Sequence, residues 1–407
     1  MGFEPTVRRT YDGFQDRSVM TTSVSLRICL MILPHTKAIV KPFFKKIFIL
    51  SFTKYYENDI IIKKSKEIHI MVILVTILRG FISAILTLTT IVMPWLVGDI
   101  TAPQAPLDSE NCLLNFATVS DLHSTTKEDN ELNSFLFDLT IPLIFPDFEA
   151  AEEKYDAFVM VGDNTDDGYD RQWAKLEKDM AQYDLADEIL IAAGNHDTWT
   201  EGEDGRTSKG LFIQYNRRIA NRVVGNLYYS TEINGYPFIV LCSEDDGVNG
   251  YFSDEQIKWL KKELKKAAEK DLPIFVICHW PLNQTHGLPV SWGEDDYDDM
   301  TGGMGEQSER IEKLLKKYDN VFLISGHIHA GLSNADTEGR TGYQSVESDG
   351  SFHSINLPRV NAIQGIGDFM IGYGYIFEVY EDRVEIRARN HALGIWNPKY
   401  NYTIELV

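Results

Sequence analysis

Five short apolar segments recur along the chain from residue 113 onward, and each of them ends in a polar, loop-like sequence. They span residues 113–120, 156–162, 188–194, 273–278 and 320–326. Their length and their content of β-branched and aromatic residues predict buried strands. Between them, segments 254–270 and 306–318 place apolar residues at helical spacing. This alternation of strands and amphipathic helices predicts an α/β domain.

Side chains that bind metal ions in proteins follow all five predicted strands. In chain order they are Asp121 and His123, Asp163, Asn195 and His196, His279, and finally His327 and His329. A lone histidine beside a strand is most often structural, but five of the ten histidines fall in these short loops. Because ligands bind outside the carboxyl ends of strands in open α/β sheets, the pattern predicts one shared site.

The donor types restrict the kind of metal site. Carboxylates, imidazoles and one amide oxygen, without a thiolate, suit Mn, Fe or Zn ions rather than a structural thiolate zinc site. Leaving His196 aside, seven donors exceed what one ion uses, so we expect two ions about 3.5–4 Å apart that share a carboxylate. In an extended segment alternate residues point the same way, so His327 and His329 are both expected to reach the ions.

The sequence blocks SDLH, GDNTDDG, GNHD, CHW and SGHIH occur in this order. With them, residues 113 to about 390 resemble the calcineurin-like metallophosphoesterase family. The resemblance implies a four-layer α-β-β-α sandwich and the hydrolysis of phosphoester bonds by a hydroxide held between two metal ions. It implies that Asp121, His123 and His329 hold one ion, that Asn195, His279 and His327 hold the other, and that Asp163 bridges them.

The same resemblance implies a role for two residues outside the metal ligands. His196 would protonate the leaving oxygen or stabilise the developing charge, and Asp166 would orient His196. Protein phosphatases of the family carry an arginine that grips phosphate directly after the Asp166 position, whereas this chain has Asp167. We therefore expect a small phosphodiester or phosphomonoester substrate, as in phosphodiesterase and purple-acid-phosphatase-like branches. Residues 373–380 and 382–390, with period-two character, are expected to supply the second sheet.

Residues 283–307 form a long glycine-rich segment after His279. One interpretation places His286 and Trp292 in a substrate cleft, because long loops inside compact domains are often functional. The other treats the acidic run at 294–299 as a solvated turn. His353 and His391 are expected to be structural.

The charge is unevenly distributed along the chain. Residues 1–98 hold 13 Lys and Arg against 6 Asp and Glu, and residues 99–407 hold 26 against 54. So acidic a body repels phosphate backbones and argues against general nucleic-acid binding. An extracellular nuclease of the same fold stays an alternative, and so does a catalytically idle surface module whose metals only brace the loops.

Residues 80–98 are uncharged and about as long as a membrane-spanning helix. With basic residues before them and the acidic body after them, segment 71–98 predicts an anchor that leaves the body outside the cytoplasm. A cleaved signal segment, which would yield a secreted protein, is the rival interpretation. Residues 1–70 are basic and their opening shows no sustained periodicity, and one hypothesis is that they are not part of the native product. Residues 99–112 are expected to be a linker and residues 113–407 the catalytic domain.

The four cysteines form no CxxC pair. Cys242 and Cys278 lie in apolar runs and are expected to be buried free thiols. A disulfide involving Cys112 is left open.

Overall fold

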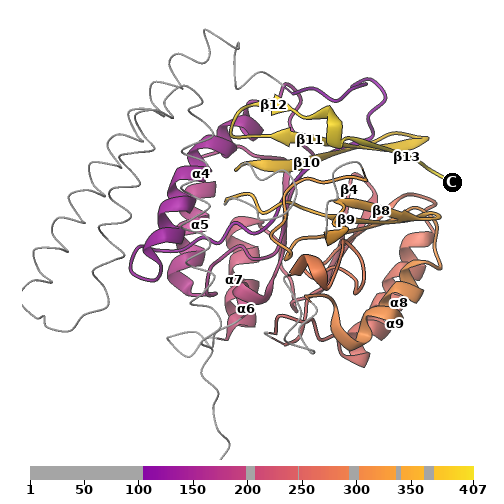
Figure 1. The fold of residues 1–407 in the computed structure, drawn as a ribbon, viewed down its shortest axis with the longest axis horizontal. Coiled ribbons are helices and arrows are strands. Elements are labelled where there is room, and N and C mark those ends of the chain that lie inside the picture. The colour runs from indigo at the N-terminus through magenta and orange to yellow at the C-terminus, as the bar shows by residue number, and fades with distance from the viewer. Residues whose placement is uncertain (1–103, 199–206, 246, 293–301, 336–340, 362–370) are drawn as a thin grey trace, which may run out of the picture. The chain divides into compact units, whose positions relative to one another are not determined.

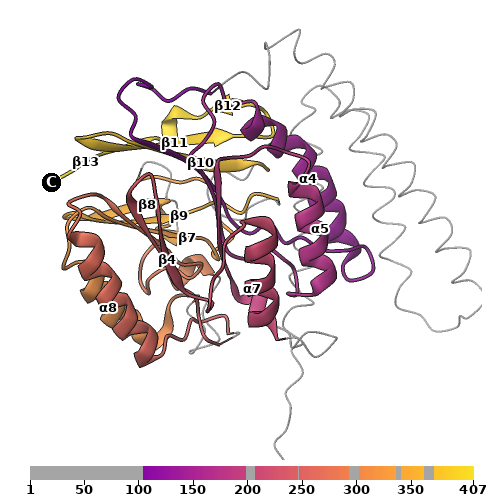
Figure 2. The ribbon, with the colours of Figure 1, turned by 180° about the vertical axis from the view of Figure 1, so that it is seen from behind.

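The structure is a computed structural model that describes residues 104–198, 207–245, 247–292, 302–335, 341–361 and 371–407. Two β-sheets lie between two groups of helices (Figure 1). Helices α4 (Glu131–Glu149), α5 (Asp170–Met180) and α7 (Ser208–Ile219) lie on one side, and α8 (Asp254–Ala268) and α9 (Ser308–Leu315) lie on the other. The view from behind shows the same order of layers (Figure 2). The α-β-β-α arrangement expected from the sequence is therefore present.

The first sheet has the strand order β12-β11-β10-β1-β2-β3, with β13 paired to β11. Its strands are β1 (Leu114–Val119), β2 (Ala157–Val161), β3 (Glu188–Ala192), β10 (Tyr373–Val379), β11 (Arg383–Asn390), β12 (Ile395–Trp396) and β13 (Tyr402–Glu405). Strands β1, β2 and β3 run parallel, and β10 pairs antiparallel with β1. The sheet is mixed.

The second sheet has the order β4-β5-β6-β7-β9-β8. It comprises β4 (Tyr229–Ile233), β5 (Tyr236–Val240), β6 (Ile274–Ile277), β7 (Val321–Ser325), β8 (Val346–Asp349) and β9 (Phe352–Asn356). Strands β5, β6, β7 and β9 are parallel, and the outer strands β4 and β8 are antiparallel. The five strands predicted to end in ligands are thus divided between the two sheets, three in the first and two in the second.

The expectation that residues 373–380 and 382–390 form the second sheet is wrong. They contain β10 and β11, which extend the first sheet from β1. All seven residues of β10 are buried, because this strand lies inside a sheet that is covered on both faces. Alternation along a strand indicates which residues face the core, but it does not say which sheet the strand joins.

Four phenylalanines hold the two sheets together. Phe116 of β1 and Phe377 of β10 stack with ring centroids 4.7 Å apart. Phe116 also makes edge contacts with Phe238 of β5 at 5.4 Å and Phe275 of β6 at 4.9 Å. Such edge-to-face pairs add stability beyond the burial of apolar area. They fix the distance between the strands that carry the candidate ligands.

Helix α8 shows why the amphipathic segments become helices. Ser253 caps its first turn by accepting a hydrogen bond from the Gln256 main-chain N–H at 3.2 Å. Ile257, Leu260 and Leu264 lie on one face and are buried, and the helix contacts β5 and β6. The lysines on its other face stay in water. The helix thus covers the outer face of the second sheet.

Residues 104–112, which were expected to belong to a linker, pack onto the folded domain. The main-chain N–H of Leu107 donates to the buried Glu378 carboxylate at 3.0 Å. The Gln104 side chain donates to the carbonyl of Asp147 at 2.8 Å, and Arg387 donates to that of Ala105 at 3.1 Å. A buried carboxylate such as Glu378 requires donors, and this segment supplies one. The folded unit therefore begins before residue 113.

The predicted anchor at 71–98, the membrane contact through residues 80–98 and the basic segment 1–70 lie outside the described residues. Among the residues that the structure does describe, no helix is both long and apolar enough to span a membrane. Cys112, Cys242 and Cys278 are free thiols, and the latter two are buried as expected.

The two histidines expected to be structural are held inside the domain. His353 Nδ1 lies 2.9 Å from the Ser348 hydroxyl. His391 Nδ1 lies 2.8 Å from Asp147, whose carboxylate also accepts two hydrogen bonds from Arg389. Both side chains are buried, as is typical of structural histidines.

Candidate active site

The loops that follow β1, β2, β3, β6 and β7 meet at one edge of the two sheets. Three overlapping groups of side chains there each place one donor atom per residue within 4.8 Å of the others. The groups are Asp121 with His123, Asp163 and His329; Asp163 with His279 and His327; and His123 with Asp166 and His196. These groups consist of histidine and aspartate side chains. Of the candidate metal ligands, Asn195, whose donor is an amide oxygen, is the one not included.

The first group surrounds Asp121. His329 Nε2 lies 3.0 Å from Asp121 Oδ1 and 3.3 Å from His123 Nε2. His123 Nε2 in turn lies 3.7 Å from Asp163 Oδ2. These atoms point toward a common centre, as ligands of one ion do.

The second group shares Asp163 with the first and adds His279 and His327. His279 Nε2 is 3.2 Å from Asp163 Oδ2, and the rings of His279 and His327 have centroids 5.0 Å apart. His279 Nδ1 donates to the carbonyl of Val161 at 2.8 Å, and His327 Nε2 donates to that of Val248 at 2.9 Å. Such bonds fix the orientation and tautomer of metal-binding histidines. The remaining ring nitrogens, Nε2 of His279 and Nδ1 of His327, are left for an ion.

The backbone at the site is locally strained. Asp121, His123 and Asp163 have φ angles of 57°, 47° and 48°, and those of His327 and His329 are 71° and 54°. Non-glycine residues rarely adopt this left-handed conformation, and it concentrates at functional sites. The extended geometry that we expected for His327 and His329 is therefore wrong. Both side chains reach the site through tight turns, and each joins a different group.

Two further residues of the GNHD block shape the site. A Cβ atom on Gly194 would lie 2.2 Å from Asp163 Oδ1, so this position has no room for a side chain. The buried carboxylate of Asp197 accepts hydrogen bonds from the main-chain N–H groups of Asn164, Thr165 and Gly194. It thereby ties the loop after β2 to the loop after β3. We did not single out Asp197 from the sequence, although it stands next to His196.

Several buried polar atoms at the site make close polar contacts but no hydrogen bond of regular geometry within the protein. They include both carboxylate oxygens of Asp121, Asp163 Oδ2, Asn195 Oδ1 and His279 Nε2. Unsatisfied buried groups are costly and rare in native proteins, and here they converge. The donor set is oxygen and imidazole nitrogen, which suits divalent ions such as Mn²⁺ or Zn²⁺. The residues present therefore fit a pair of metal ions.

The pKa values of two candidate histidines agree with metal binding at this site. Burial lowers the pKa of His327 to about 3, and burial together with the charge of Arg359 lowers that of His123 to about 4. Both rings are neutral at pH 7, the form in which imidazole binds metal. Against the effect of burial, the charges of Asp163 and Asp121 raise the pKa of His279 to about 9. An ion that binds His279 must therefore displace a proton.

His196 and Asp166 lie beside the first group, but their contact differs from the expected one. The His196 ring is oriented by the main-chain carbonyl of Asp166, which lies 2.6 Å from Nδ1. The Asp166 carboxylate lies 3.3 Å from His123 Nδ1 instead, and it accepts hydrogen bonds from Asn130 and Asn133. Asp166 thus supports both histidines, and its carboxylate contacts the predicted metal ligand.

Trp292 lies at the site, whereas His286 does not line it. The Trp292 ring stacks on His327 with centroids 4.4 Å apart and planes 18° from parallel. His286 is fully buried, and its two ring nitrogens lie 2.6 Å from the carbonyl of Gln344 and 2.9 Å from the Ser354 hydroxyl. The cleft interpretation is therefore wrong for His286. The acidic run at 294–299 lies outside the described residues.

Replacing His286 with alanine is expected to lower the free energy of unfolding by about 2–4 kcal/mol, because it opens a cavity and removes the hydrogen-bond partner of the buried Ser354 hydroxyl. Turnover per folded molecule should stay within about twofold of the wild-type value, since the residue binds no reacting group. Urea unfolding and active-fraction kinetics measure the two quantities. A large fall in turnover at unchanged stability would restore His286 to the cleft.

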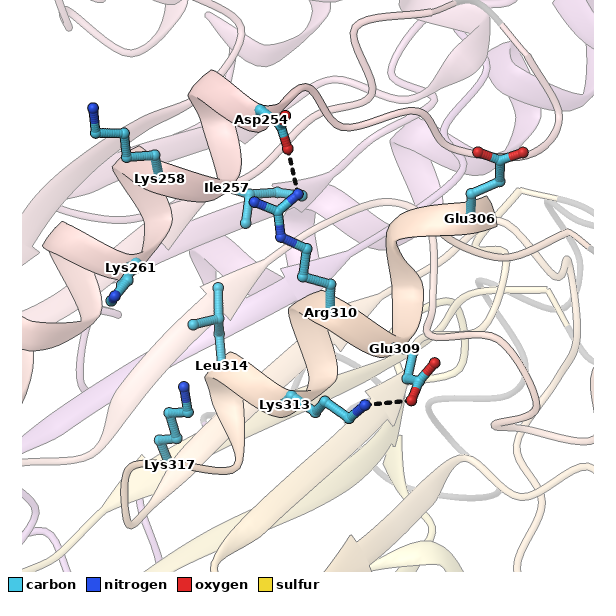
Figure 3. Close-up of a pocket in the computed structure, with 10 residues that line it drawn as sticks. All are labelled: Asp254, Ile257, Lys258, Lys261, Glu306, Glu309, Arg310, Lys313, Leu314 and Lys317. Carbon is cyan, nitrogen blue, oxygen red and sulfur yellow. Dashed lines mark hydrogen bonds and ion pairs between the residues drawn. The ribbon is translucent and has the colours of Figure 1, made fainter.

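A groove of about 700 Å³ lies between α8 and α9, and none of the candidate site residues lines it (Figure 3). Ile257 and Leu314 form part of its wall, and the rest is charged. Arg310 of α9 pairs with Asp254 of α8, and Lys313 pairs with Glu309 within α9. The groove is thus a feature separate from the candidate active site.

The chain is similar to known proteins over part of its length. It is 26% identical over 181 residues to a protein named probable glycerophosphodiester phosphodiesterase GpdQ from Arcobacter nitrofigilis, covering 43% of this chain and 57% of the relative. It is 27% identical over 183 residues to a protein named probable cyclic nucleotide phosphodiesterase from Rhodococcus erythropolis, covering 44% and 53%. The chain thus spans about half the length of these curated relatives.

Among solved structures, a dimetal phosphatase from Danio rerio aligns with 73% of this chain and 100% of its own, at 16% identity and a TM-score of 0.48. The sequence model of the family described as calcineurin-like phosphoesterase matches residues 114–331. This match covers more than half of the chain and contains all of the candidate ligands. The chain therefore belongs to the calcineurin-like phosphoesterase family.

Proposed function

We propose that the protein hydrolyses phosphoester bonds, in phosphodiesters or phosphomonoesters, with two metal ions held at this site. The observation that supports the proposal most directly is the position of Asp163. One oxygen of its buried carboxylate lies 3.7 Å from His123 Nε2 in the first ligand group and 3.2 Å from His279 Nε2 in the second. A carboxylate between two ligand groups is what a bridged pair of ions requires.

The ions, when bound, would polarise the phosphoryl oxygens and make a water molecule nucleophilic at neutral pH. The chain's own residues hold them and supply the proton chemistry. Asp121, His123 and His329 would hold one ion, Asn195, His279 and His327 the other, and Asp163 both. His196, fixed through Nδ1 by the Asp166 carbonyl, would deliver a proton to the leaving oxygen from Nε2.

The names of the relatives favour phosphodiesters as the substrate class, since three of the four matched relatives are named as phosphodiesterases and one as a purple acid phosphatase. A catalytically idle module braced by metals is the alternative. The placement of His196 disfavours it, because a purely structural metal site has no use for an oriented imidazole beside its ligands. The acidity of residues 99–407, with 54 Asp and Glu against 26 Lys and Arg, disfavours a nuclease.

The experiment that tests the proposal is hydrolysis of a substrate panel by chelator-treated protein before and after Mn²⁺ is added. The panel contains p-nitrophenyl phosphate, its bis ester, cyclic nucleotides and single-stranded DNA. We expect Mn²⁺ to increase hydrolysis of at least one small ester by at least about tenfold, since the ions neutralise phosphoryl charge. It should also raise the melting temperature, because ligands that bind only the folded state stabilise it.

Stabilisation by Mn²⁺ without hydrolysis of any ester would favour the idle module. Hydrolysis that survives exhaustive chelation would contradict the metal mechanism. Rapid cleavage of DNA with little activity on small esters would favour the nuclease.

A further inference from the structure

Arg359 follows β9 and reaches the candidate metal site from the second sheet. Its main-chain N–H donates to the carbonyl of Ala330 at 3.2 Å, and its backbone bridges to Ser120 next to Asp121. Its Nε donates to Asn361 Oδ1 at 3.0 Å, and its Nη1 lies 3.1 Å from His329 Nδ1. The guanidinium therefore lies directly against one of the candidate metal ligands.

Asn361 fixes the arginine in this place. Its side-chain amide donates to the carbonyl of Leu122, between Asp121 and His123, while its oxygen accepts from Arg359 Nε. Asn361 is fully buried, so the contact is held firmly. One edge of the guanidinium is thus anchored to the loop after β1 through Asn361, and Nη1 makes the contact with His329.

The contact between Arg359 and His329 cannot coexist with a metal ion on His329. A guanidinium can only donate, so His329 Nδ1 must accept, and the proton of the neutral ring then lies on Nε2. If Nε2 binds an ion, Nδ1 carries the proton and no longer accepts. If Nδ1 binds the ion, its lone pair is already used. Coordination by His329 through either nitrogen therefore releases Nη1 of Arg359.

We propose that Arg359 binds the phosphoryl oxygens of the substrate once His329 has turned to its metal ion. The proposal rests on the proposed function and adds a substrate-positioning residue to it. The planar fork of a guanidinium matches two oxygens of a phosphate, and such charge-assisted pairs are among the strongest hydrogen bonds. The substrate would need a phosphate with anionic non-bridging oxygens, which mono- and diesters both possess.

Nearby carboxylates explain how the positively charged Arg359 side chain can lie beside a site for positively charged metal ions. Burial lowers the pKa of Arg359, and the negative charges of Asp121, Asp166 and Asp163 oppose this effect. Bound ions would neutralise much of this negative charge. A phosphate that arrives with the substrate would then be an additional anionic partner for the guanidinium.

In the variant Arg359→Ala, the affinity for Mn²⁺ and the affinity for phosphate are expected to change differently. Arg359→Ala removes a donor that competes for His329 and a positive charge near the ions, so Mn²⁺ affinity should be unchanged or higher. The affinity of the Mn²⁺-loaded protein for inorganic phosphate should fall about 10- to 100-fold, the range for a lost hydrogen bond between charged groups. An arginine that merely supported His329 would lower Mn²⁺ affinity when removed.

The experiment is calorimetric titration of the full chain with Mn²⁺ and then with inorganic phosphate. Arg359→Lys keeps the charge without the fork and should retain an intermediate phosphate affinity. Arg222→Ala is the matched control, because Arg222 is another partly buried arginine and pairs with Glu188 at 2.6 Å away from the site. It should bind both probes like the wild type.

Weaker phosphate binding with retained Mn²⁺ binding supports the proposal. Loss of Mn²⁺ affinity in Arg359→Ala, or unchanged phosphate affinity in both Arg359 variants, overturns it. Should Arg359→Ala fail to fold, the phosphate affinity of Arg359→Lys relative to the wild type decides alone. If the wild-type protein binds both probes but hydrolyses no ester, the proposed function fails while the role of Arg359 is still judged from phosphate binding. A wild-type protein that binds Mn²⁺ but no phosphate overturns the role of Arg359.

Discussion

Replacing Asp163 with asparagine is expected to reduce turnover by at least about 10³-fold and to remove at least one of two bound ions. Asparagine has nearly the same size, and its oxygen can still accept the 3.0 Å hydrogen bond from the His196 main chain. It lacks the negative charge that both ligand groups share. Several kcal/mol of charge stabilisation depend on bound ions, and each 1.36 kcal/mol corresponds to about tenfold in rate.

Steady-state kinetics at saturating Mn²⁺ and elemental analysis of the purified variant measure the two effects. Asp349→Asn is the control, since this carboxylate is exposed, pairs with Lys316 at 2.6 Å and belongs to none of the ligand groups. It should keep both ions and full turnover. Two ions retained by Asp163→Asn, with activity near that of the control, would show that Asp163 does not bridge.

The sequence predicted which histidine and aspartate side chains gather at this site, because the rule behind the prediction is simple. Apolar runs become buried strands, and side chains after their carboxyl ends meet at one edge. The rule held although the strands belong to two sheets, because the facing sheets bring the ends of β1, β2 and β3 close to those of β6 and β7. His329 Nε2 and Asp121 Oδ1, 3.0 Å apart, come from different sheets.

Contacts that depend on the exact path of a loop could not be predicted. Nothing in the pattern shows that Asp166 uses its carbonyl for His196 and its carboxylate for His123. A lone arginine 30 residues after His329 gives no signal, and Arg359 reaches the site only because β9 pairs with β7. The position of His286 after His279 suggested a cleft residue. The two groups next to its ring nitrogens, however, lie on β9 and in the loop before β8.

Replacing His196 with alanine is expected to reduce turnover by about 10²- to 10⁴-fold on esters with a poor leaving group, the range for a lost general acid. Both ions should stay bound, because the His196 main-chain N–H, which donates to Asp163 Oδ1, is kept in the variant. The short helix α6 (Asn195–Thr198) also tolerates alanine. The ligands around Asp163 should therefore remain in place while the proton donor is lost.

The choice of leaving group provides the internal control for this variant. An alkyl phosphodiester releases a strongly basic alkoxide and needs the proton, whereas p-nitrophenolate leaves without one. The loss on a p-nitrophenyl ester should therefore be less than about tenfold, while the loss on the alkyl ester is at least about 100-fold. Equal losses on both esters would mean that His196 stabilises the phosphoryl group and not the leaving oxygen. Loss of the ions themselves would make His196 a part of the metal site, which its ring, held through Nδ1 by the Asp166 carbonyl, argues against.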